Sequence, residues 1–136
     1  MRVVLDTNVL FAAFRLGSGF CHDLFRHCIL RHEIVTSEHI LDELRRHLTG
    51  KGKLTTEKIN EVIEGLRSAS TVVQPAIVPA HTCRDPDDLA VLGTAIVSQA
   101  SVLVTGDNDL LTLHPFTNIA ILSPRAFHTQ YVLSNL

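Results

Sequence analysis

Short apolar runs alternate with longer amphipathic segments along this chain, and that alternation limits its possible folds more than any other feature. Residues 2–5, 33–37, 101–107 and 118–122 have the composition of strands, whereas residues 20–32, 38–48, 55–70, 85–100 and a last segment from 123 have helical spacing. The strand runs are largely apolar, which is typical of parallel strands covered on both faces. We therefore predict a three-layer α/β/α sandwich around a central parallel sheet. Residues 71–79 are also extended, but their two prolines place them at a strand end or sheet edge.

Length and composition fit one globular domain over residues 1–136. Of the 136 residues, 46% are hydrophobic and 19% are charged, which is enough for a substantial core. No apolar run is long enough to cross a membrane, and the three cysteines show no CxxC spacing, so we expect a cytoplasmic protein without a membrane partner. The net charge of -2 gives no overall attraction for nucleic acid.

Two of the predicted strands end in the same way, with an aspartate just past the apolar run. Asp6 follows the first strand, and Asp107 follows the strand within residues 101–107. Because the carboxyl ends of parallel strands lie at one edge of a sheet, where ligand sites gather, we expect these two side chains to meet there.

Two predicted helices add a carboxylate each. In residues 38–48, Glu43 lies at the edge of the apolar stripe and Asp42 faces solvent. In residues 85–100, Asp88 is in line with the apolar residues, whereas Asp87 points away. The sequence therefore predicts a convergent cluster of four acids: Asp6, Glu43, Asp88 and Asp107.

Four close carboxylates repel one another, which raises the pKa of some members unless a cation is present. An all-oxygen ligand set without a nearby histidine or cysteine group favours Mg²⁺ or Mn²⁺ over zinc. One or two such ions can polarise a phosphodiester and activate a water for attack. The pattern thus favours a metal-dependent phosphodiesterase.

Each acid also has a structural explanation. Asp88 could complete a capping box with Asp85, and Glu43 could be an ordinary surface residue. Asp107 could belong to a tight turn, and Asp6 could cap a short helix. The common direction of the four side chains is what favours a site.

The basic residues cluster while the histidines are scattered. Four cations lie close in sequence and could form a solvated face or guide an RNA backbone: Arg45, Arg46, Lys51 and Lys53. The eight histidines show no ligand spacing, so we expect them at the surface or partly buried.

Four segments, "VVLDTNVLFAAF", "SEHILDEL", "DPDDLAVLGTA" and "SVLVTGDNDLL", resemble the PIN domain in order and spacing. The segment "ILSPRAF" is similar to the ending of a bacterial subgroup, the VapC-like ribonucleases that are toxin components of toxin-antitoxin systems. The resemblance implies a three-layer α/β/α fold and endoribonuclease activity that depends on Mg²⁺ or Mn²⁺. It also implies an RNA substrate and a small antitoxin partner, and we expect a homodimer.

The resemblance assigns roles to the acids and to their neighbours. The four catalytic and metal-binding acids of the family fall on the four residues of the predicted cluster: Asp6, Glu43, Asp88 and Asp107. Asn8 and Thr105 match polar positions that support the acids, and Asp109 matches an accessory acid. Asp85 is close enough to assist.

The same residues are compatible with other functions. The chain could be an RNA-processing nuclease without a toxin role, a structure-specific DNA nuclease, or an inactive module that binds metal or nucleic acid. An aspartyl-phosphate phosphatase would use Asp6 as nucleophile, but that group would have a second aspartate where Asn8 stands.

Overall fold

The computed structural model describes residues 1–135 and contains one sheet whose strands are all parallel. Its strands are β1 (Arg2–Leu5), β2 (Glu33–Thr36), β3 (Ser70–Val72), β4 (Val102–Val104) and β5 (Ala120–Leu122), in the spatial order β3-β2-β1-β4-β5. The predicted parallel sheet is confirmed. The extended segment that contains β3 lies at a sheet edge, as its prolines indicate.

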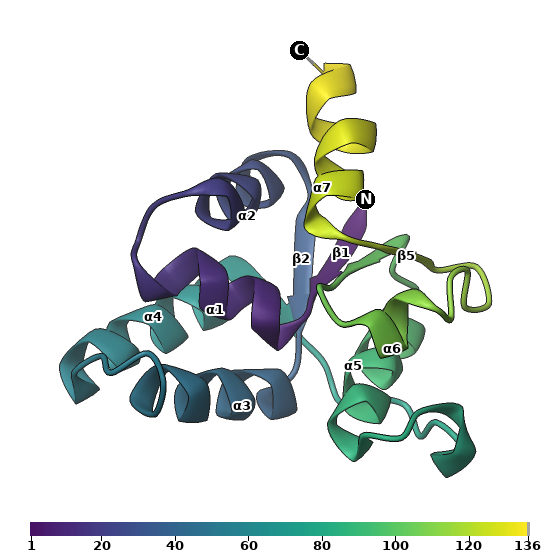
Figure 1. The fold of residues 1–136 in the computed structure, drawn as a ribbon, viewed down its shortest axis with the longest axis horizontal. Helices are drawn as coiled ribbons and strands as arrows, with labels where there is room; N and C mark the ends of the chain where they lie inside the picture. The colour runs from purple at the N-terminus through teal and green to yellow at the C-terminus, as the bar shows by residue number, and fades with distance from the viewer. Residues whose placement is uncertain (136) are drawn as a thin grey trace.

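Helices cover both faces of this sheet. They are α1 (Thr7–Arg15), α2 (Phe20–Arg31), α3 (Glu38–Thr49), α4 (Thr56–Ala69), α5 (Pro86–Val97), α6 (Asn108–Leu111) and α7 (Pro124–Phe127). Two 3₁₀ turns, Ala80–Thr82 and Leu133–Asn135, and one π-helical turn, His128–Val132, are the other helical segments of the described residues. In Figure 1, α1 to α4 lie on one side of the sheet, and α5 and α6 lie on the other. The predicted three-layer architecture is confirmed.

The two central strands position the site. Every residue of β4 is fully buried, and so are Val3 and Val4 in β1. Leu5 pairs with Val104 in the register of the two strands, so the chain leaves both strands at the same level. The amide of Asp6 donates to the carbonyl of Val104 at 2.9 Å. Burial of these strands therefore fixes the start of the segments that follow them.

Two helices begin directly at the strand-end aspartates. α1 follows Asp6 and is longer than the short helix that the sequence suggests, because Val9, Leu10 and Ala13 share its buried face. α6 follows Asp107, so this aspartate begins a short helix rather than a tight turn. Both aspartates accept a backbone hydrogen bond as helix N-caps.

The described helices differ from membrane spans in length and apolarity. Within residues 1–135, no helix is long and apolar enough to cross a bilayer.

Candidate functional site

A small cavity of about 150 Å³ at the carboxyl edge of the sheet is lined by all four predicted acids. Asp6 reaches it from the end of β1 and Asp107 from the segment after β4, while Glu43 comes from α3 and Asp88 from α5. The remaining lining residues are Thr7, Asn8, His47 and Asp85. Neighbouring strands whose connections leave toward opposite faces of a parallel sheet create such a crevice.

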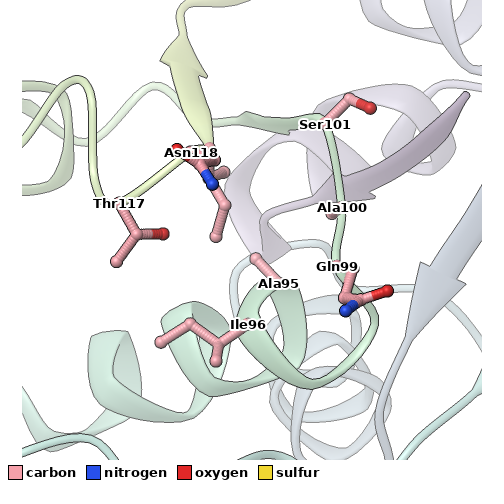
Figure 2. A pocket seen from close by; sticks show the side chains of 8 residues that line it. Ala95, Ile96, Gln99, Ala100, Ser101, Thr117 and Asn118 are labelled. Carbon is pink, nitrogen blue, oxygen red and sulfur yellow. The ribbon is translucent and has the colours of Figure 1, made fainter.

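A larger pocket of about 400 Å³ lies at the opposite edge of the sheet, just before β4 and β5. Figure 2 shows its lining, which includes Gln99, Ser101, Thr117 and Asn118. None of its lining residues has a titratable side chain. Chemistry rather than size therefore makes the acidic cavity the candidate site.

Asp6 is only 4% exposed, and its carboxylate accepts three hydrogen bonds. The backbone amide of Thr7 donates to Oδ1 at 2.7 Å, and the Thr105 hydroxyl donates to Oδ2 at 2.7 Å. The Asn8 amide also donates to Oδ2, at 3.1 Å, and its carbonyl oxygen accepts from Gly106. Burial raises the pKa of Asp6, while these donors act in the opposite direction. The carboxylate is thus fixed in orientation from β1, α1 and the segment after β4.

Asp88 is the least satisfied carboxylate of the cavity. Its side chain is 7% exposed, and its buried Oδ2 has no hydrogen-bond partner. Asp85 caps α5 by accepting from the Asp87 amide at 3.0 Å, but the bond from Asp88 that would complete a capping box is not formed. Burial, followed by the charges of Asp107 and Asp6, raises the pKa of Asp88 to about 7. Helix capping does not explain this side chain.

Replacing Asp88 by asparagine should stabilise the metal-free protein at alkaline pH. The folded state holds the Asp88 proton up to about pH 7, whereas the unfolded chain releases it near 3.8, so stability falls as pH rises between these values. We expect D88N to gain about 2 kcal/mol relative to the wild type at pH 8 and nothing at pH 4. Urea unfolding in EDTA at both pH values measures this difference, and an equal effect at both would contradict it.

The other acids occupy different positions relative to the cavity. Glu43 is half-buried, and its pKa is raised mainly by burial and to a smaller degree by the charges of Asp87 and Asp6. Asp107 caps α6 by accepting from the Asp109 amide at 2.9 Å. The Asp109 side chain instead pairs with Arg84 through both oxygens at 2.9 Å, and it is not among the lining residues. Asp109 therefore lies beside the cavity and Asp85 within its wall.

The direction expected for Asp87 is wrong, whereas the histidines are exposed or partly buried as expected and one of them reaches the cavity. Asp87 does not point away, because its Oδ1 lies 2.9 Å from His39 Nε2 and its charge affects Glu43. His47 lines the cavity, and burial together with nearby cations lowers its pKa. His39, Glu43 and His47 are spaced four residues apart on α3, so they share one helical face. The sequence signal for this face is the four-residue spacing of the two histidines from Glu43, since the histidines are eight residues apart from each other.

The four acids surround the cavity more loosely than a closed ligand shell. Within residues 1–135, no three of them have ligand atoms that all lie within 4.8 Å of one another. The one group that meets this distance is His39, Glu43 and Asp87, of which Glu43 alone belongs to the predicted cluster. The spacing of the histidines in the sequence did not predict a histidine beside Glu43.

The basic residues divide between two directions. Arg45 donates to Asn60 at 2.8 Å and so faces α4. Arg46 and Lys51 are close enough to His47 to lower its pKa, and the Lys51 ammonium lies 4.9 Å from the centroid of the Phe11 ring. Lys53 is exposed in the segment after α3. Arg46 and Lys51 are thus the two cations whose charges act on His47, which lines the cavity.

A family model described as "PIN domain" matches residues 2–109, which include every residue that lines the cavity. The chain belongs to the PIN domain family. PIN domains are nucleases, and PIN nucleases generally use a divalent metal ion. Membership in the PIN family gives no support to the phosphatase alternative.

The fold of this PIN domain is similar to that of a chain in the crystal structure of VapBC2 from Rickettsia felis bound to a DNA fragment from their promoter. The two chains are 17% identical, the match covers 90% of this chain and 98% of the other, and the TM-score is 0.64. At this identity the likeness concerns the fold. A search of curated protein sequences gave no match.

Proposed function

We propose that this PIN domain is a metal-dependent endoribonuclease and the toxin component of a type II toxin-antitoxin system. The observation that carries the nuclease proposal is the buried carboxylate of Asp88, whose Oδ2 has no partner in a cavity shared with three further acids. The VapBC2 complex, which has a chain of similar fold, supports the toxin role.

The donor set of the cavity fits a hard divalent cation. Asp6, Glu43, Asp88 and Asp107 offer carboxylate oxygens, which Mg²⁺ and Mn²⁺ prefer, and the partnerless oxygen of Asp88 is available to a cation. These four residues would hold the ion. When bound, the ion would offset the phosphodiester charge and activate a water for attack.

Other residues of the chain orient this set. Thr105 both donates to Asp6 and accepts from the Asp107 amide at 3.0 Å, so one hydroxyl sets the two strand-end acids. Asn8 joins Asp6 to the Gly106 backbone. Ligands whose positions are fixed by such bonds need little rearrangement on binding.

The cations near the cavity support RNA as the substrate. Arg46 and Lys51 would contact the phosphates of RNA that enters past His47, and the exposed Lys53 would extend this contact, whereas Arg45 is held by Asn60. The proposal includes a small antitoxin and a homodimeric toxin. Light scattering of the protein, expressed alone and together with a neighbouring short reading frame, measures both.

Incubation of RNA with the purified protein tests the proposal. We expect cleavage with Mg²⁺ or Mn²⁺, none with EDTA, and none by D107N, because this variant removes one cavity carboxylate. Expression of the wild type but not of D107N should arrest bacterial growth. Equal cleavage by both proteins would show that the activity comes from a contaminant or from another site.

Cleavage of DNA with the same sequence distinguishes the ribonuclease proposal from the DNA nuclease alternative. Acidic residues and a metal ion do not distinguish sugars, so discrimination against DNA requires contacts to the 2′-OH. Faster cleavage of structured DNA than of RNA would replace the ribonuclease proposal by the DNA nuclease alternative. Metal binding without cleavage of either would support the inactive binding module.

A further inference from the structure

One histidine and two carboxylates from α3 and α5 come together beside the acidic cavity. One ligand atom from each of His39, Glu43 and Asp87 lies within 4.8 Å of the other two. In the described part of the chain, no other group of three histidine, cysteine or acidic side chains is this close. We infer that these three residues form a binding site for a transition metal ion such as Zn²⁺, which shares Glu43 with the all-oxygen set of the cavity and adds a nitrogen ligand.

Helix geometry places the three ligands. His39 and Glu43 are one turn apart on the same face of α3, and α3 packs against α5. Asp87 is in the first turn of α5, where the Asp85 carboxylate holds its backbone amide at 3.0 Å. The backbone positions of all three residues are therefore set by two packed helices rather than by a loop.

The Nε2 atom of His39 is available to bind a metal ion. Its Nε2 is buried and lies 2.9 Å from Asp87 Oδ1, yet it has no hydrogen-bond partner, so the carboxylate is off the direction of that nitrogen. Zinc bonds of about 2 Å in a tetrahedron separate the ligand atoms by about 3.3 Å. Small rotations of His39 and Asp87, whose side chains are 36% and 42% exposed, would bring them to that spacing.

The composition of the group selects the ion. Imidazole nitrogen suits zinc and its neighbours in the first transition row, whereas Mg²⁺ prefers oxygen ligands. Three protein ligands with the fourth position open to water is a common zinc arrangement. Glu43 faces two like charges, those of Asp87 and Asp6, and a dication beside it would offset this repulsion.

Calorimetric titration with Zn²⁺, in a large excess of Mg²⁺, tests the site without relying on nuclease activity. Loss of an outer partner of a metal ligand costs roughly 10- to 100-fold in affinity, so loss of a ligand in H39A should cost about 100-fold or more. H22A is the matched control, because His22 lies 3.8 Å from Asp23 in a pair that lacks a third ligand. Equal losses in both variants, or none in H39A, would overturn the inference.

Two further measurements keep the test independent of folding and of the proposed function. In imidazole ¹H–¹⁵N spectra of the wild type, one equivalent of Zn²⁺ should shift the resonances of His39 before those of the other seven histidines. D88N, which alters the acidic cavity, should retain Zn²⁺ binding even where RNA cleavage is lost. If another histidine shifts first, the His39–Asp87 contact is an ion pair only.

Discussion

Replacement of Asp6 by asparagine should lower RNA cleavage on the order of 10³-fold, because the proposed ion loses a carboxylate that is fixed on three sides. Asparagine keeps one carbonyl oxygen and can still cap α1, so the fold should survive. The new amide NH₂ group, however, is a donor and would face the donor groups of Thr105 and Asn8, which now bond to the carboxylate. The expected result is a folded protein without catalysis.

Initial cleavage rates at saturating Mg²⁺, together with an amide NMR spectrum of each variant, measure this effect. D42N is the matched control, since Asp42 is an exposed carboxylate next to Glu43 on α3 and lies outside the cavity lining. It should cleave RNA at the wild-type rate. A native spectrum with undiminished cleavage in D6N would remove Asp6 from the proposed site.

Replacement of Gly93 by alanine should destabilise the protein by about 3 kcal/mol, against the direction of helix propensity. Alanine is favoured over glycine by about 1 kcal/mol in a helix interior. At Gly93, however, an added Cβ would lie 2.2 Å from the backbone carbonyl oxygen of Ala76. The Ala76 amide also donates to the Gly93 carbonyl at 3.0 Å, so the two backbones are already in contact and must separate.

Gly65 provides the comparison that separates these two effects. It lies within α4, and an added Cβ there would meet no atom within 4 Å. G65A should therefore gain about 1 kcal/mol from propensity alone. Urea unfolding of both variants measures the contrast, and a G93A protein as stable as G65A would contradict the close approach.

Local rules were sufficient to place the four acids. The end of a buried parallel strand predicts which edge of the sheet Asp6 and Asp107 reach, and helical periodicity predicts that Asp88 faces inward. These features depend on short stretches of sequence. The alternation of strand and helix signals likewise predicts the layers, since parallel strands require helical connections.

Contacts between elements were harder to predict. Periodicity gives the face of α3 that carries His39 and His47, but the docking of α5 decides which partners that face meets, and Asp87 was misplaced for this reason. The apolar residues of α1 are nearly continuous, which obscures their helical period. α5 ends at Val97 rather than at 100, because Gln99 adopts a left-handed conformation with φ of 54°.

The register that joins β1 to β4 also makes the cavity depend on contacts between distant parts of the chain. Asp6 lies near the start of the chain, and Asp107 reaches the same cavity only when β4 has paired with β1. Without the segment after β4, the chain lacks one wall of the cavity. The long sequence separation of the two aspartates thus couples formation of the cavity to formation of the central sheet.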